Sequence, residues 1–108
     1  MIDFKEYIAK RISVALEINE TEVEKSIEEP KGTENGDYSF PCFRLAKTLK
    51  KAPQLTAEEI KSKLIIDENV ITKIEVIGGY INFFVNNETL GMQVFLYLRK
   101  SLYNHLLL

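Results

Sequence analysis

The sequence predicts an α+β domain in which a small antiparallel sheet of about four strands packs against helices in two layers. Two segments alternate between apolar and polar residues as strands do, 70–77 (VITKIEVI) and 80–85 (YINFFV). Between them, Gly78 and Gly79 permit the positive φ angles of a two-residue hairpin turn. Other segments repeat apolar residues at helical spacing, and 108 residues suffice for one domain with a buried core.

The first helix is expected over 4–16, where one stripe collects the side chains of Phe4, Ile8, Ile12, Ala15 and Leu16. Asp3 is a suitable N-cap, with Glu6 three residues later. Farther along the chain, 23–29 alternates weakly and is interpreted as an edge strand of the sheet. The polar, turn-rich segment 30–37 (PKGTENGD) predicts a surface loop.

Two more helices are expected before the hairpin. The first starts near Pro41, since proline suits a first helical turn, and ends at Pro53. One side of it would be apolar, and the opposite side would carry a basic ridge made of Arg44, Lys47 and Lys51. Such a ridge is usually a solvated face, with phosphate binding as the alternative. The second helix is expected to start at Thr56, which forms a capping box with Glu59, and to run to about Leu64.

The predicted hairpin has two different faces. A tight turn would pair Ile77 with Tyr80, Glu75 with Asn82, and Lys73 with Phe84. The inward face would then hold Ile74, Val76, Ile81, Phe83 and Val85, and the outward patch would hold Lys73, Ile77, Tyr80, Asn82 and Phe84. Two rings and an amide suit stacking on a flat ligand such as a base and bonding its edge. The alternative is an amphipathic strand whose second face lies under a helix or another domain.

Composition limits the function classes. A net charge of −2 and a pI near 5.5 argue against a protein that holds nucleic acid by bulk attraction, so any RNA contact must be local. Cys42 is the only cysteine, which excludes an internal disulfide and a multi-cysteine metal site, and we expect it to be a small buried residue. Acidic residues near the start argue against a signal peptide, and no apolar run approaches the ~20 residues of a membrane span. A cytoplasmic protein without a membrane partner is therefore expected.

The last segment, 87–108, is expected to be a helix that is apolar on nearly all sides. Such a helix is normally buried between partners. It would either connect the domain formed by 1–86 to a further domain of a longer protein or form the interface of a homodimer.

Two blocks of the sequence resemble one known family. They are 36–60 (GDYSFPCFRLAKTLKKAPQLTAEEI) and, after a short gap, 74–86 (IEVIGGYINFFVN). Together, in this order and separation, they resemble the N-terminal additional domain of arginyl-tRNA synthetase. The resemblance extends over nearly the whole chain. It implies an α+β domain, with a small antiparallel sheet backed by helices, that precedes a class I catalytic domain.

The resemblance also implies a site. In that family the domain grips the outer corner of arginine tRNA and contacts a D-loop base with residues that match 77–82 here. Tyr80 would stack on the base and Asn82 would bond its edge, with Phe84 on the same face. Some members have an amide residue where this chain has Ile77, so one hydrogen bond to the base would be lost. The cations expected to meet phosphates are Lys73, Arg44, Lys47 and Lys51.

The parent enzyme of such a domain ligates arginine to its tRNA with ATP and Mg²⁺, which belong to its catalytic domain. This chain has neither the HIGH-type nor the KMSKS-type signature, so no catalysis and no cofactor are expected on it. The implied partners are arginine tRNA and the enzyme's own catalytic domain, with no DNA.

Two other functions remain open at this point. One is a freestanding α+β module that binds a protein through the face of Tyr80 and Phe84. The other is a small acid/base enzyme built on Asp37, Tyr38 and His105, although no spacing among these residues defines a site.

Overall fold

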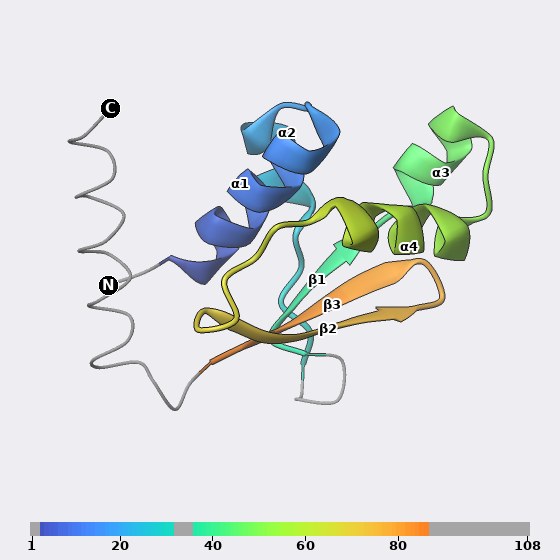
Figure 1. The fold of residues 1–108 in the computed structure, drawn as a ribbon. Helices are drawn as coiled ribbons and strands as arrows, with labels where there is room; N and C mark the ends of the chain where they lie inside the picture. Colours follow the sequence, from blue (N-terminus) through green and yellow to red (C-terminus); the bar gives the residue numbers. More distant parts are fainter. Residues whose placement is uncertain (1–2, 32–35, 87–108) are drawn as a thin grey trace.

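The computed structural model describes residues 3–31 and 36–86 (Figure 1). Its elements, in chain order, are α1 (Phe4–Leu16), α2 (Glu20–Ser26), β1 (Tyr38–Pro41), α3 (Phe43–Leu49), α4 (Pro53–Lys63), β2 (Ile71–Ile77) and β3 (Tyr80–Val85). The predicted α+β class is confirmed. The helix expected over 87–108 and the middle of the loop expected over 30–37 lie outside the described residues, as does His105.

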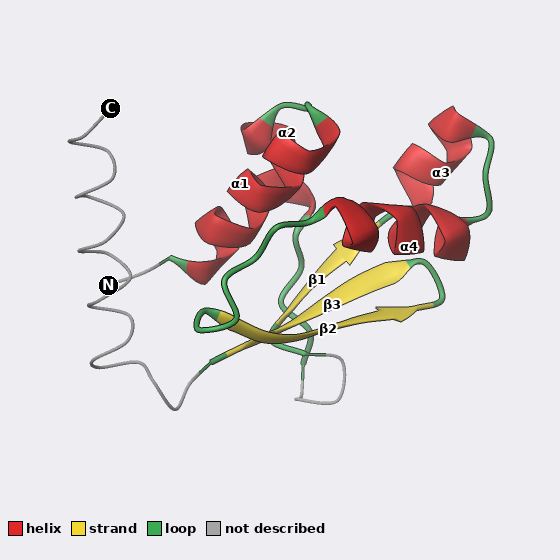
Figure 2. Cartoon of the chain, viewed as in Figure 1, coloured by secondary structure: helices red, strands yellow, loops and turns green. Residues whose placement is uncertain are grey.

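The described strands form an antiparallel sheet in the order β1-β3-β2, so the described sheet has three strands where about four were expected. Figure 2 shows the helices gathered on one side of this sheet. Between the two layers lies a core of fully buried side chains from α1, α4 and β3, among them Ile8, Ile12, Ala57, Ile81 and Phe83. The other face of the sheet carries the predicted outward patch.

The first helix forms as predicted. The Asp3 carboxylate accepts a hydrogen bond from the Glu6 backbone N–H at 3.1 Å and satisfies one of the free donors at the start of α1. Glu17 ends the helix in the left-handed conformation with φ 55°. Within α1, Ile8 and Ile12 are four residues apart and both are completely buried, so this face anchors the helix layer on the sheet.

The edge strand expected over 23–29 is wrong, because most of this segment belongs to α2. The Asn19 side chain caps that helix by accepting from the Glu22 N–H at 3.2 Å. Val23 and Ile27 are four residues apart, so a helical turn buries both, although the same spacing also fits a weak strand alternation. Only Glu28 behaves like a strand residue, in a single bridge with Ser39.

The boundaries of the next two helices also differ from the expectation. Pro41 lies in β1, and α3 ends at Leu49 because Lys50 adopts a left-handed conformation with φ 56°. Pro53 therefore does not end α3 but opens α4, where its missing N–H has no intrahelical partner to lose. Thr56 lies inside α4 and donates its hydroxyl to the Ala52 carbonyl at 3.0 Å, so the predicted capping box does not form.

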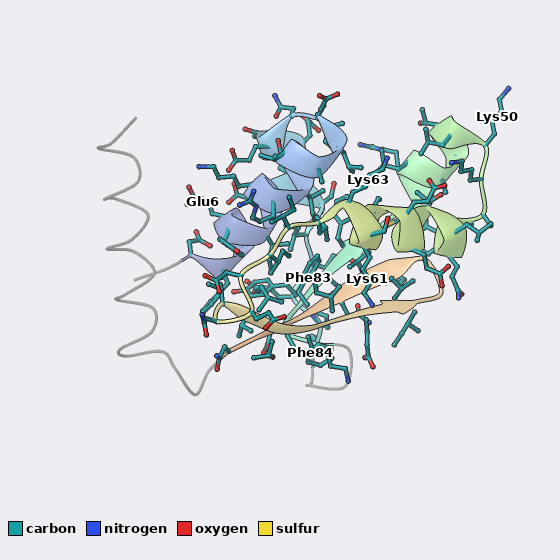
Figure 3. The ribbon with its side chains drawn as sticks, in the orientation of Figure 1. Glu6, Lys50, Lys61, Lys63, Phe83 and Phe84 are labelled. Carbon is teal, nitrogen blue, oxygen red and sulfur yellow. The ribbon has the colours of Figure 1, made fainter. Side chains whose placement is uncertain are left out.

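The hairpin has the predicted register: Ile77 is opposite Tyr80, Glu75 opposite Asn82, and Lys73 opposite Phe84. A register shift between Ile71 and Lys73 is the only irregularity in this pairing of the described strands. Gly78 and Gly79 have φ of +56° and +100°, conformations that glycine adopts without a steric penalty. Figure 3 shows the consequence for neighbouring side chains, with Phe83 on the helix side of the sheet and Phe84 on the opposite side.

The structure confirms that Cys42 is a small buried residue. Its Sγ is 3.8 Å from the Phe40 carbonyl oxygen, and burial raises the pKa of the thiol to about 12. In the unfolded chain a thiol ionises near pH 8.5. As the pH rises above that value, the unfolded state loses its proton first and is favoured, so the stability that the neutral thiol contributes is lost progressively up to the native pKa.

We therefore expect the free energy of unfolding to fall between pH 8 and pH 10 and part of this fall to disappear in Cys42→Ala. Urea denaturation of both proteins at the two pH values measures the difference. The alanine variant serves as its own control for all other titrating groups. An identical pH dependence in both proteins would contradict a buried, neutral thiol.

None of the described helices has the length and apolar character needed to cross a membrane.

Candidate nucleic-acid interface

The face of the sheet that carries Tyr80 and Asn82 has a hollow of about 340 Å³. Its lining comes from the hairpin, from β1 and from the segment after α2, and consists of Ile77, Tyr80, Asn82, Ser39, Glu28, Glu29 and Pro30. We call it the Tyr80 hollow. Three of the predicted site residues, Ile77, Tyr80 and Asn82, are thus brought together. The side chains of Ile77 and Tyr80 are 50% and 38% exposed, so both are open to a ligand.

Asn82 faces outward as predicted but is not an exposed residue, because only 2% of its surface is accessible. Ser39 lies directly opposite it on β1 and donates its hydroxyl to Asn82 Oδ1 at 2.8 Å. Asn82 Nδ2 has no hydrogen-bond partner among the described residues. In the described part of the chain, only one side-chain nitrogen or oxygen is both fully buried and without a hydrogen-bond partner, and it is Arg11 Nε. Since Asn82 Nδ2 has no partner either, it must retain some solvent access. The Asn82 amide therefore has N–H donors that no described residue uses.

The Tyr80 ring packs against an aromatic residue that the sequence analysis did not single out. Phe43, the first residue of α3, meets Tyr80 edge to face with ring centroids 5.1 Å apart and an interplanar angle of 78°. This geometry is favourable for aromatic pairs, and Tyr80 stays partly exposed beside Phe43. One signal in the sequence could have revealed Phe43, because it is a large aromatic residue that lies off the apolar side of its helix. The structure leaves it 45% exposed.

Lys73 and Phe84 share the outward face but lie outside the Tyr80 hollow. Phe84 and Tyr80 are four residues apart on β3, a separation of roughly 13 Å along a strand. The Lys73 Nζ lies 5.2 Å from the centre of the Phe84 ring and 3.0 Å from a carboxylate oxygen of Glu75. The single outward patch expected from the hairpin is therefore two separate sites, a hollow at the turn and a cation-π pair at the far end.

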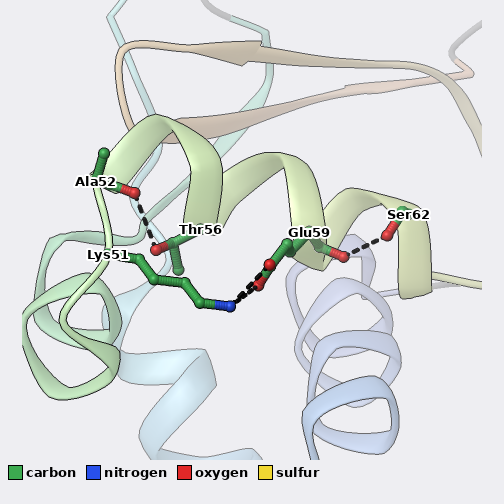
Figure 4. A network of polar contacts seen from close by, with 5 residues as sticks. All are labelled: Lys51, Ala52, Thr56, Glu59 and Ser62. Atoms are coloured by element: carbon green, nitrogen blue, oxygen red, sulfur yellow. Dashed lines mark hydrogen bonds and ion pairs between the residues drawn. The ribbon is translucent and has the colours of Figure 1, made fainter.

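The expected basic ridge of three residues does not form as one face. Lys51 lies beyond the end of α3, and its Nζ reaches across to the Glu59 carboxylate of α4 at 2.8 and 2.9 Å (Figure 4). The hydrogen bond from Lys51, together with its charge, lowers the pKa of Glu59. Arg44 and Lys47 remain exposed on α3 and take part in no ion pair with the described residues.

Two glutamates give the Tyr80 hollow an acidic side. Glu28 and Glu29 are both exposed and line it, opposite to the expectation that cations surround the site. Carboxylates repel phosphate and accept hydrogen bonds from amino groups, so the hollow suits the neutral base of a nucleotide better than its backbone. Sequence reasoning missed these residues because the segment was interpreted as an edge strand. Among the described residues, no cluster of His, Cys, Asp and Glu is suited to hold a metal ion.

The sequence profile described as the arginyl tRNA synthetase N terminal domain matches residues 3–85, almost all of the described chain. The chain belongs to this family. Its sequence is 43% identical over 95 residues to the arginine-tRNA ligase of Alkaliphilus metalliredigens, covering 87% of this chain and 17% of that protein. It is 46% identical over 89 residues to the arginine-tRNA ligase of Clostridium botulinum, covering 82% and 16%.

A solved structure agrees with the family assignment. Arginyl-tRNA synthetase of Thermus thermophilus superposes on this arginyl-tRNA synthetase N-terminal domain with a TM-score of 0.66 and 33% sequence identity, covering 80% of this chain and 14% of that one. The chain thus spans about a sixth of the length of the curated relatives named above. The resemblance inferred from 36–60 and 74–86 is confirmed. Both blocks contribute to the Tyr80 hollow, the first with Ser39 and the second with Ile77, Tyr80 and Asn82.

Proposed function

We propose that this chain is the tRNA-binding domain of an arginine-tRNA ligase and that it contacts the D-loop at the outer corner of arginine tRNA. One observation carries the proposal. In a chain of this family, the Tyr80 hollow combines a half-exposed aromatic ring with a buried amide whose N–H groups are unused. Aromatic stacking with edge hydrogen bonds is the usual way in which proteins recognise unpaired RNA bases.

Each residue then has a distinct role. Tyr80 stacks on an unpaired D-loop base, and Phe43 packs against the Tyr80 ring. Asn82 donates to the edge of that base from the floor of the hollow, and Ile77 offers apolar contact at the rim. Stacking contributes affinity for any base, because every base has a π-face, and the amide accounts for the choice of base.

The cations act around this site. Arg44 and Lys47 on α3 are free to meet phosphates, which positions the RNA without reading its sequence. Lys73 contributes after releasing Glu75, and Lys51 contributes least because it is held by Glu59. A net charge of −2 limits the electrostatic share, so we expect the isolated domain to bind weakly.

The ligation of arginine belongs, in this proposal, to the longer protein of which such a domain is part. ATP and Mg²⁺ would be bound by its catalytic domain, which is the second partner of this chain. A cytoplasmic location follows from a role in translation.

Titration of labelled arginine tRNA tests the proposal. Tyr80→Ala is expected to raise the Kd about 5- to 150-fold, the range that corresponds to 1–3 kcal/mol for one stacked base. Tyr80→Phe keeps the ring and should bind within a few-fold of the wild type. Replacing each unpaired D-loop nucleotide in turn then identifies the base, because only its replacement weakens the wild-type complex.

Phe84→Ala is the matched control, since Phe84 is an aromatic residue on the same face of the same strand but outside the Tyr80 hollow. It should leave the Kd nearly unchanged. Equal losses for Tyr80→Ala and Phe84→Ala would contradict a base-binding hollow. The protein-interaction module would be supported instead by two results together. The wild-type chain would show no response to tRNA at millimolar sensitivity, and Tyr80→Ala would lose the binding of a protein ligand.

A further inference from the structure

We propose that Ser39 is a positioning residue for RNA recognition: its hydroxyl orients the Asn82 amide, and this orientation decides which kind of base edge the Tyr80 hollow accepts. The proposal rests on the proposed function and adds a specificity role for a residue that lies outside the hairpin. Its starting point is the hydrogen bond from Ser39 Oγ to Asn82 Oδ1, 2.8 Å long and buried between residues 43 positions apart in the sequence.

Backbone pairing holds the two side chains close. The Ser39 N–H donates to the Glu28 carbonyl and the Glu28 N–H donates to the Ser39 carbonyl, both at 2.8 Å. These bonds point away from β3, which makes Ser39 and Asn82 a non-hydrogen-bonded pair of the antiparallel ladder. Side chains in such a pair approach more closely than in a hydrogen-bonded pair. The pairing with Glu28 thus holds Ser39 in the position where its hydroxyl lies close to the Asn82 amide.

The hydroxyl then selects one of two amide orientations. An asparagine amide offers an acceptor at one end and two donors at the other, so a half rotation exchanges them. Asn82 is the only hydrogen-bond partner of Ser39 Oγ among the described residues, and Ser39 is 4% exposed. A rotated amide would leave the buried hydroxyl proton without an acceptor, which is unfavourable. Oδ1 therefore stays on Ser39, and Nδ2 stays available to the ligand.

This orientation has a consequence for recognition. With Nδ2 available, the floor of the hollow offers a donor, and the base it accepts must present an acceptor there. Without the Ser39 hydroxyl both orientations become comparable in free energy, and the amide serves a donor edge as well as an acceptor edge. Ser39 thus contributes to the choice of base through the orientation of Asn82.

Four arginine tRNA transcripts that differ only at the D-loop nucleotide sensed by wild-type protein test this inference. The wild type should show a ratio of Kd values between its worst and best base, and Ser39→Ala should reduce that ratio about fivefold, as expected for one neutral hydrogen bond. Ser39→Thr retains the hydroxyl and should restore the ratio. A folded Ser39→Ala that keeps the full ratio overturns the proposal.

Asn82→Asp provides a test that does not depend on the stability of Ser39→Ala. An aspartate still accepts from Ser39 but offers the hollow an acceptor where the amide offered donors. The order of preference among the four transcripts should therefore reverse toward bases with a donor on the sensed edge. An unchanged order contradicts the proposal.

A measurement without RNA separates this inference from the proposed function. In ¹⁵N-labelled protein, the Asn82 Nδ2 amide signals should have the same displaced chemical shifts in the wild type and in Ser39→Thr. In Ser39→Ala they should move toward the shifts of an unconstrained amide, because the side chain then samples both orientations. If the wild type does not bind tRNA, the proposed function fails although these signals behave as expected. If tRNA binds and the Asn82 signals are the same in all three proteins, only the role of Ser39 is refuted.

Discussion

Replacing Phe83 with alanine is expected to lower the free energy of unfolding by about 3–5 kcal/mol, the usual loss for truncating a fully buried phenylalanine. Among residues 3–31 and 36–86, Phe83 is the largest completely buried side chain, and it lies on β3, the central strand of the described sheet. Domains of this size are stable by only about 5–15 kcal/mol, so the variant should be partly unfolded near body temperature. Thermal and urea denaturation followed by circular dichroism measure the loss.

Phe84→Ala is the control for that loss. It removes an identical side chain one residue along the same strand, but Phe84 lies on the uncovered face over the Lys73 ammonium. We expect a loss of about 1 kcal/mol, from partial burial and a partly exposed cation-π contact. Comparable losses in the two variants would mean that both faces of β3 are buried, against the layer arrangement described above.

The second large effect is expected at the hairpin turn. A Cβ on Gly79 would lie 2.7 Å from Pro53 Cβ and 3.1 Å from Phe43 Cε1, and the residue has φ +100°, which side chains rarely adopt. Gly79→Ala therefore combines backbone strain with overpacking and should destabilise the domain by about 2–4 kcal/mol. Because the displaced Phe43 ring supports Tyr80, the affinity for tRNA should fall as well.

Gly78→Ala tests whether contact or turn conformation is responsible. Gly78 also has a positive φ of +56°, but a Cβ there meets no atom within 4 Å. Only the conformational penalty of about 1–2 kcal/mol should remain, and tRNA binding should be preserved in the folded fraction. Denaturation curves and tRNA titrations of both variants provide the comparison. If Gly78→Ala were as damaging as Gly79→Ala, the packing of the turn against Phe43 and Pro53 could not be the cause.

Gly79 shows how the fold and the candidate site depend on each other. The turn can approach the start of α3 only because it carries no side chain at this position. That approach brings the Phe43 ring under Tyr80, and it is also where the Cys42 N–H donates to the Gly79 carbonyl at 2.9 Å. The position of Tyr80 is therefore fixed by contacts with a segment almost forty residues earlier in the chain.

Local patterns predicted the helix α1 and the hairpin correctly. The Asp3 cap, the apolar stripe of α1 and the Gly78-Gly79 turn each depend on residues close together in the sequence. The same reasoning failed for 23–29 and for the start of α4. Val23 and Ile27 are spaced for a helix as much as for a weak strand, and Thr56 with Glu59 resembles a capping box although Pro53 starts that helix one turn earlier.

The candidate site likewise has a part that the sequence predicts and a part that it does not. Ile77 and Tyr80 could be assigned to one end of the outward face from the sequence, because alternation and a two-residue turn define the register of a hairpin. The burial of Asn82 could not, because it depends on Ser39 lying opposite it and on Glu28 pairing beyond Ser39. Phe43, Glu28 and Glu29 likewise lie at the site because of contacts between segments far apart in the sequence. The spacing of apolar residues and the residue types of a turn are local features of the sequence. The partners of a strand edge, in contrast, depend on the packing of the entire domain.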